Sequence, residues 1–191
     1  QNCTELRVEP KGDAPAVCNG DPATFQFTLT NASLLVDVTD VYFNVELGTG
    51  FGTPTVTALD AAGNTITLGK SGNSYILRSL PKSTNVNLST VTIKVTASAT
   101  TDQSTATLKV TKSSDVPMNI SAEQKVKVYS VPEAKFASST SELCYGQEQT
   151  EANVALSKGT FPYTIQYKVG SGSAITKSAD KSPYTIEETL T

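Results

Sequence analysis

ATFQFTLT (23–30) is the stretch that decides how this chain folds. Apolar residues occupy every second position from Ala23, and threonine or glutamine fills the positions between them. A period of two puts successive side chains on opposite faces of an extended strand, so the pattern predicts a strand with one buried face. The alternation returns in VYFNVEL (41–47) and, most strongly, in VTIKVTA (91–97).

Turn sequences separate these strands along the whole chain. GTGFGTP (48–54) and DAAGN (60–64) are two examples, rich in the residues that turns favour. Turn signals recur every ~8–12 residues, a spacing typical of antiparallel β-sandwiches. No segment has the pattern of a crossover helix, which parallel strands would need. We therefore predict an all-β fold of antiparallel sandwich modules.

The segment KVKVYSVPEAKFASSTSELCYG (125–146) is interpreted as a joint between two modules. Pro132 ends any ladder pairing there, because proline has no N–H to donate. A new strand start follows at 134–137, and then Cys144-Tyr-Gly repeats the Cys18-Asn-Gly found near the N-terminus. The second module is shorter than the ~100 residues of a complete sandwich, so we expect a small or truncated β domain. The predicted modules are residues 1–132 and 133–191.

Composition excludes several classes of partner. The net charge is −3, only 17% of residues are charged, and no run of Lys or Arg occurs. Nucleic acids and anionic membrane surfaces bind basic patches, so we expect neither as a partner. No apolar run approaches the roughly 20 residues of a membrane helix, so no membrane insertion is expected.

The three cysteines suggest an extracellular chain. Low charge and widely spaced cysteines without a CxxC motif are typical of proteins in compartments where disulfides persist. We predict a Cys3–Cys18 disulfide, which would close a short loop. Cys144 is then left over, and two explanations stay open: a partner in sequence beyond Thr191, or a buried free thiol.

The absence of histidine is the strongest statement about chemistry. It removes Ser-His-Asp and Cys-His catalysis and every imidazole-ligated metal site. Glu187 and Glu188 are the one adjacent carboxylate pair, and neighbours on a strand point to opposite faces. We predict no catalytic residue, no cofactor and no enzyme activity. An enzyme with two facing carboxyl groups about 5–10 Å apart is the weakest alternative.

Calcium could use the oxygens of Asp37 and Asp40, or of Asp60 and Asn64. Neither pair has the spacing of an EF-hand loop. Acidic residues and asparagine are common in turns. We therefore expect solvated turn residues and no metal site.

Tyrosines are the candidates for a ligand-facing surface. Tryptophan is absent, so an aromatic platform for sugar would need Tyr or Phe. Tyr163 and Tyr167 share one face of PYTIQYKV (162–169), and Tyr184 faces inward on a later predicted strand, residues 183–187. Aromatic side chains dominate sandwich interiors, so a core role is favoured over a platform for all three.

The first module resembles the DUF11-type conserved repeat of bacterial surface proteins. The resemblance rests on ATFQFTLTN (23–31), DVTDVYFNVELGTGF (37–51) and YILRSLPKSTNVNLSTVTIKVTAS (75–98). It implies an immunoglobulin-like sandwich that serves as a spacer in long surface proteins.

The second module resembles the repeats of Bacteroidota gliding adhesins and related proteins exported by the type IX secretion system. ELCYGQ (142–147), GTFPYTIQYKVG (159–170) and SPYTIEETL (182–190) carry this resemblance. The final Gly-Cys of those repeats is missing here, which is consistent with truncation and with the unpaired Cys144. Neither family implies catalytic residues.

Together these features predict a non-enzymatic structural or adhesive segment of a large secreted or cell-surface bacterial protein. Its expected partners are neighbouring modules of the same polypeptide and a surface glycan or protein ligand, which an exposed loop would contact. The alternative is a carbohydrate-binding or accessory module of a multidomain extracellular enzyme.

Overall fold

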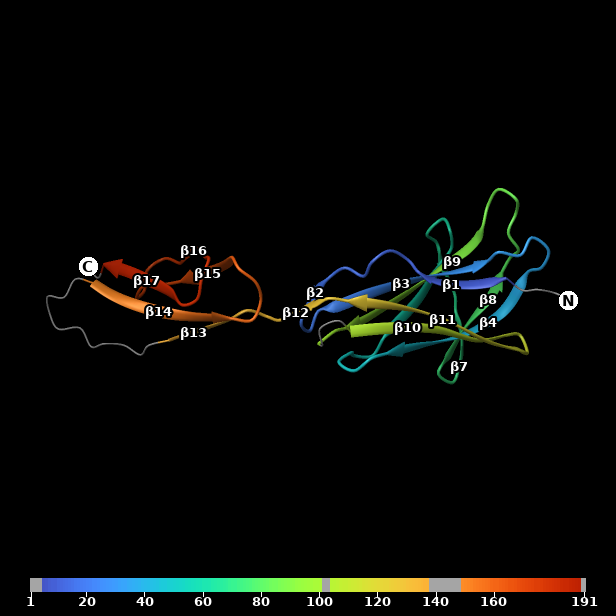
Figure 1. The fold of residues 1–191 in the computed structure, drawn as a ribbon, viewed down its shortest axis with the longest axis horizontal. Helices are drawn as coiled ribbons and strands as arrows, with labels where there is room; N and C mark the ends of the chain where they lie inside the picture. The colour runs from blue at the N-terminus through green and yellow to red at the C-terminus, as the bar shows by residue number, and fades with distance from the viewer. Residues whose placement is uncertain (1–4, 101–103, 138–148, 190–191) are drawn as a thin grey trace. The chain divides into compact units, whose positions relative to one another are not determined.

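The computed structural model describes residues 5–100, 104–137 and 149–189 (Figure 1). The chain divides into two compact units, Gln1–Tyr129 (unit 1) and Ser130–Thr191 (unit 2). Every regular element in the described residues is a β-strand, so the predicted all-β class is confirmed.

Unit 1 contains two five-stranded antiparallel sheets, in the orders β1-β3-β9-β5-β6 and β11-β10-β4-β8-β7. The strands of the first sheet are β1 (Leu6–Pro10), β3 (Pro22–Asn31), β9 (Ser89–Ser98), β5 (Thr55–Leu59) and β6 (Thr65–Ile66). Those of the second are β11 (Val116–Val126), β10 (Ser104–Ser113), β4 (Val38–Leu47), β8 (Ser74–Leu80) and β7 (Gly69–Ser71).

The period-two pattern selects the core of unit 1. On β3 every predicted inward residue is completely buried, and all four belong to the core cluster of unit 1. On β4 the pattern holds only for the first half: Val41 and Phe43 are buried, but Val45 and Leu47 are partly exposed. The difference arises because β8 pairs with β4 only as far as Phe43. The largest fully buried side chains are Phe25, Phe27, Phe43, Leu29, Leu77, Leu80, Ile93, Leu108, Val38, Val41, Val95 and Val110.

One short ladder differs from the antiparallel expectation. β2 (Val17–Cys18) pairs in parallel with β12 (Val128–Tyr129), the last strand of unit 1. These two short strands form a separate two-stranded sheet. Val126 ends β11 and Val128 begins β12, and both side chains are buried.

Unit 2 consists of a three-stranded and a two-stranded sheet. β13 (Glu133–Phe136), β14 (Gln149–Ser157) and β17 (Tyr184–Thr189) form the first in the order β13-β14-β17. β15 (Tyr163–Tyr167) and β16 (Ile175–Ala179) form the second, a hairpin whose connection includes Gly170 with φ 54°. The core is Val154, Leu156, Tyr163, Ala179 and Ile186.

Candidate functional site

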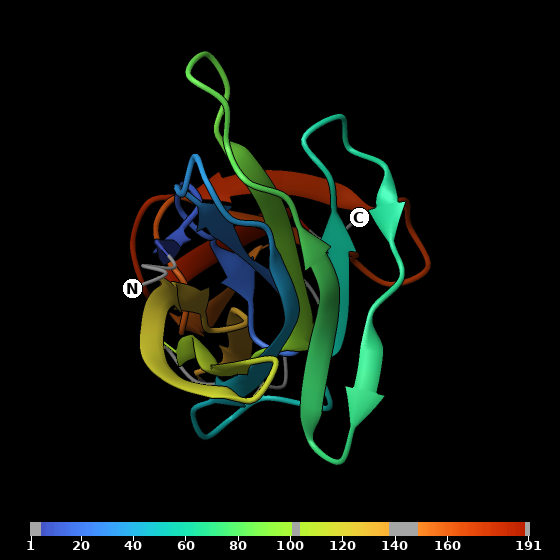
Figure 2. The same ribbon diagram turned by 90° about the vertical axis from the view of Figure 1, so that its right-hand side faces the viewer.

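Three connections share one end of unit 1, the end at which β1 begins. They are residues 32–37 between β3 and β4, residues 81–88 between β8 and β9, and residues 114–115 between β10 and β11. Both views show the 81–88 loop standing clear of the two sheets (Figures 1 and 2). We call this region the loop end.

Apolar side chains gather at the loop end. The described residues include nine exposed large hydrophobics, and five of them lie on or beside these three connections. Leu35 and Val86 are 84% and 85% exposed. Single exposed apolar residues are ordinary, whereas a group of them marks an interaction surface. Four of the five, Leu34, Leu35, Val86 and Leu88, lie on the two larger connections and are called the apolar tip below, whereas Val116 begins β11.

Asn31 fixes the two larger loops to each other. It ends β3, is completely buried, and its Nδ2 lies 2.9 Å from the carbonyl oxygen of Val36. The same nitrogen lies 3.1 Å from each of the carbonyl oxygens of Leu80 and Pro81, at the start of the other loop. A buried amide satisfied by both loops resists separation of the loops, because each lost partner leaves a buried polar group unpaired.

Ser83 and Asp37 complete this attachment. Ser83 Oγ donates to the carbonyl oxygen of Asn31 at 2.6 Å, and its backbone N–H donates to Ser33 O at 2.8 Å. Asp37 Oδ1 accepts from the backbone N–H of Lys82 at 2.9 Å. The side chains of the apolar tip therefore project from loops whose bases are held by buried hydrogen bonds.

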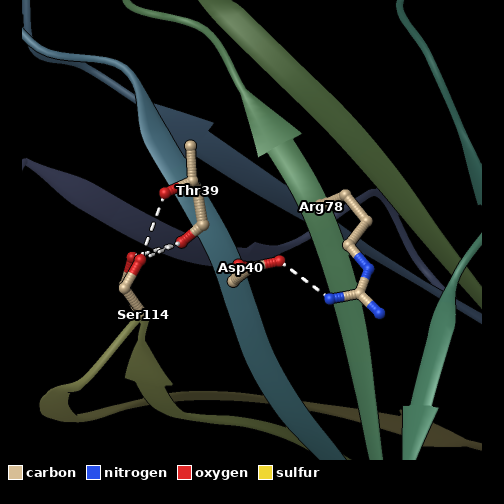
Figure 3. A network of polar contacts seen from close by, with 5 residues as sticks. Thr39, Asp40, Arg78 and Ser114 are labelled. Atoms are coloured by element: carbon tan, nitrogen blue, oxygen red, sulfur yellow. Dashed lines mark hydrogen bonds and ion pairs between the residues drawn. The ribbon is translucent and has the colours of Figure 1, made fainter.

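A polar network holds the third connection against β4 (Figure 3). Asp40 has a φ of 46°, a conformation that aspartate tolerates better than most residues. Its carbonyl oxygen accepts from Ser114 N at 3.0 Å, and its Oδ1 lies 3.0 Å from Arg78 Nη1 on β8. Thr39 Oγ1 and Ser114 Oγ are 3.1 Å apart. The side chains are exposed, so the network positions the turn more than it stabilises the fold.

The carboxylates considered for calcium have partners within the protein. Asp37 and Asp40 are engaged as described above, and Asp60 Oδ1 accepts from the backbone N–H groups of Ala62 and Asn64 at 3.0 and 2.8 Å. The Asn64 N–H bond is the main cause of a lowered Asp60 pKa. Within the described ranges no three His, Cys, Asp or Glu side chains form a group that could hold a metal. The expectation of no metal stays a prediction.

The predicted disulfide lies partly outside the described residues. Cys18 is exposed on β2 and has no disulfide partner in the described part of the chain, whereas Cys3 and Cys144 belong to ranges the structure does not describe. The Cys3–Cys18 bond and the two explanations of Cys144 therefore stay predictions.

The three candidate tyrosines all pack against the core of unit 2. Tyr163 is only 8% exposed, and its hydroxyl donates to Lys158 O at 2.7 Å. Tyr163 and Tyr167 line a groove of about 350 Å³ beside β13, but Tyr184 does not. Their role in glycan binding stays a prediction.

A second hollow, of about 480 Å³, lies on unit 1 and has no signal in the sequence pattern. Its polar lining includes Asn44, Glu46 and Lys70. Its one aromatic ring, Tyr75, already has two contacts: Lys70 Nζ lies 3.6 Å from the ring centroid, and Phe43 stacks on the ring with centroids 5.6 Å apart.

In the described residues no helix is long and apolar enough to span a bilayer.

No protein family and no curated protein matches the chain. Among solved structures it is similar to a cohesin module from a Clostridium perfringens family 33 glycoside hydrolase (14% identity, TM-score 0.42, covering 68% of this chain and 100% of that chain). It is also similar to BslA, a bacterial hydrophobin, with 13% identity and a TM-score of 0.39, covering 66% of this chain and 95% of that chain. A third similar structure is a variant of BcpA, the major pilin subunit of Bacillus cereus, with 10% identity and a TM-score of 0.41, covering 97% of this chain and 66% of that chain. These are distant similarities of fold to bacterial β-sandwich proteins.

Proposed function

We propose that the chain is a non-catalytic structural and adhesive segment of a large secreted or cell-surface bacterial protein, and that the apolar tip of unit 1 is its adhesive contact. The four exposed apolar side chains Leu34, Leu35, Val86 and Leu88, on two loops joined at their bases by buried hydrogen bonds, carry this proposal. Fixed loops lose little conformational entropy when they bind, which favours contact through them.

The chemistry of the tip indicates an apolar partner surface. Residues 32–37 and 81–88 contain one Asp and one Lys, so the two loops together carry no formal net charge. Burying each Leu or Val contributes about 1.5–3 kcal/mol. The absence of histidine and the sequence resemblance to surface-protein repeats support a role in contact rather than catalysis.

Adsorption of the full chain to polystyrene beads, with bare silica beads for comparison, tests the proposal. The variant with Leu34→Ser, Leu35→Ser, Val86→Ser and Leu88→Ser should adsorb to polystyrene at least about tenfold more weakly, because four apolar contacts are removed. Val131→Ser with Phe136→Ser removes exposed apolar residues elsewhere and should change adsorption little. Equal adsorption of the two variants would overturn the proposal.

A further inference from the structure

Val86 of the apolar tip lies in a hydrogen-bonded turn. Thr84 N donates to Asn87 O at 2.9 Å, and Asn87 N donates to Thr84 Oγ1 at 3.1 Å. Ser89 N, where β9 begins, donates to Ser83 Oγ at 2.8 Å. The loop thus satisfies these backbone groups itself while the Val86 side chain points away from the protein as an exposed group. Figure 2 shows the loop standing clear of the sheets.

The shorter loop presents its leucines in a similar way. Ser33 Oγ accepts from Leu35 N and from Val36 N, both at 3.2 Å, so the hydroxyl closes the turn that carries Leu34 and Leu35. In an apolar surrounding an unpaired backbone N–H is costly, whereas an N–H already bonded within the protein enters at little cost. Both turns therefore suit a place from which water is partly excluded.

The charges of the two loops lie at their bases. Asp37 is the residue next to β4, and its Oδ1 accepts from the backbone N–H of Lys82, the second residue after β8. Residues 32–36 and 83–88, which carry the tip, contain no charged side chain. The net charge of the chain is −3, so charge gives it no attraction to an anionic surface. The tip is thus suited to a neutral, apolar partner.

The form of the tip favours a lipid surface over a folded protein partner. A stable protein interface buries about 800 Å² on each partner and involves roughly 20–30 residues a side. The tip offers four large apolar side chains on two projecting loops, which is too little contact for such an interface by itself. A bilayer needs no matching pocket, because apolar groups enter its headgroup and acyl boundary wherever they touch it.

We propose that the apolar tip binds lipid surfaces, with its four side chains entering the boundary between the headgroups and acyl chains of a neutral bilayer. This inference rests on the proposed adhesive role and names its partner. The contact is interfacial rather than transmembrane. Three leucines and one valine have about as many side-chain carbons as one myristoyl chain, which binds membranes reversibly with a constant of about 10⁴ M⁻¹. Leu34 and Leu88 are partly covered by the protein, so we expect a constant below that value.

Co-sedimentation of the full chain with phosphatidylcholine vesicles at about millimolar lipid tests this inference. Wild type should bind. The variant with serine at the four tip positions should bind at least about tenfold more weakly, because the apolar contacts are removed. Val131→Ser with Phe136→Ser should bind like wild type. All these positions are exposed, so the melting temperatures of the variants should stay equal and any loss of folding is visible.

A tryptophan probe reports whether the tip itself enters the lipid. The chain contains no tryptophan, so Val86→Trp gives a single emitter at the tip, and Val131→Trp gives a matched one at an exposed valine of unit 2. With vesicles, the emission of Val86→Trp should shift to shorter wavelength and be quenched by brominated phosphatidylcholine. Val131→Trp should show neither change. Equal responses of the two variants overturn the inference.

The vesicle assay also separates this inference from the adhesive role. Binding that the four serines leave unchanged, or that requires phosphatidylglycerol and is lost in high salt, overturns the lipid contact. So does a wild type that adsorbs to polystyrene through the tip but binds no vesicles, and the adhesive role then stands. A wild type that binds neither vesicles nor polystyrene overturns both proposals.

Discussion

The side chain of Gln124 bonds to the backbone of Gln26 across the two sheets of unit 1. Gln124 Oε1 on β11 accepts from Gln26 N on β3 at 2.9 Å, although 98 residues separate them in sequence. Gln124 Nε2 donates to Gly12 O at 2.8 Å. These contacts lie just beyond the end of β1 at Pro10, where Lys11 N donates to Gln26 O at 2.8 Å and the Gln124 side chain accepts from Gln26 N. The buried Gln124 side chain thus supplies the acceptor for the Gln26 N–H at the point where β1 has ended.

Gln124→Ala should therefore destabilise unit 1 by about 1–3 kcal/mol, because it leaves a backbone N–H buried and unpaired. The change in unfolding free energy is measured by urea unfolding, as a shift of the midpoint with an unchanged m-value. Gln26→Ala is the matched control, since Gln26 takes part in this bond through its backbone nitrogen. A loss for Gln124→Ala no larger than that for Gln26→Ala would contradict the assignment.

Asn31→Ala should loosen both larger loops of the loop end. The change removes the Nδ2 contacts with Val36 and Leu80 while the buried carbonyls remain, a cost of roughly 1–3 kcal/mol. Hydrogen exchange of the amide of Ser83 should accelerate as the unfolding or opening free energy falls. Asn87→Ala, at an exposed asparagine on the same loop, should leave the exchange rate of the Ser83 amide unchanged. Unaltered protection of Ser83 in Asn31→Ala would show that the amide does not hold the loops.

The same substitution, valine to alanine, should lower the free energy of unfolding by different amounts at a buried and at an exposed position. Val95 on β9 is completely buried, whereas Val86 on the tip loop is 85% exposed. Val95→Ala should cost roughly 2–3 kcal/mol through lost transfer energy and the cavity left behind, and Val86→Ala close to nothing. Thermal and urea unfolding of both variants measure this. Similar costs would mean that the 81–88 loop packs against the protein.

The carboxylate of Glu133 should titrate below the ordinary glutamate range. A hydrogen bond from the Lys158 ammonium lowers the pKa of Glu133, and the charges of Lys158 and, less, Lys135 add to this. A lowered folded pKa means that the stabilisation is present above the unfolded pKa and is lost as the pH falls through the folded one. Carbon-detected NMR titration should show Lys158→Met raising the Glu133 pKa more than Lys135→Met does. The opposite order would contradict the pairing with Lys158.

Local periodicity was enough to predict the strands but not the contacts that join them. The alternation at 23–30 and 91–97 predicts β3 and β9 and their buried faces, because a period of two depends only on neighbouring residues. Beyond Phe43 the inward residues of β4 are only partly buried, because β8 pairs with β4 only as far as Phe43. The sequence of β4 alone does not predict where this pairing ends.

The candidate site shows the same division. Asn31 ends β3, and its amide is buried against Leu80 and Pro81. Those partners lie 49 and 50 positions away, so no local pattern identifies them. The apolar tip could not be predicted from the sequence either. Leu34 and Leu35 have the composition of core residues, and only the structure shows that they are exposed.

Single-molecule force spectroscopy tests the adhesive role of the apolar tip most directly. The full chain, attached to a cantilever through a flexible tether, is brought against a methyl-terminated surface and withdrawn. We predict frequent rupture events for wild type and for the Val131→Ser, Phe136→Ser control, and few for the variant with serine at Leu34, Leu35, Val86 and Leu88. Rupture events of equal frequency and force in the tip variant would contradict the account.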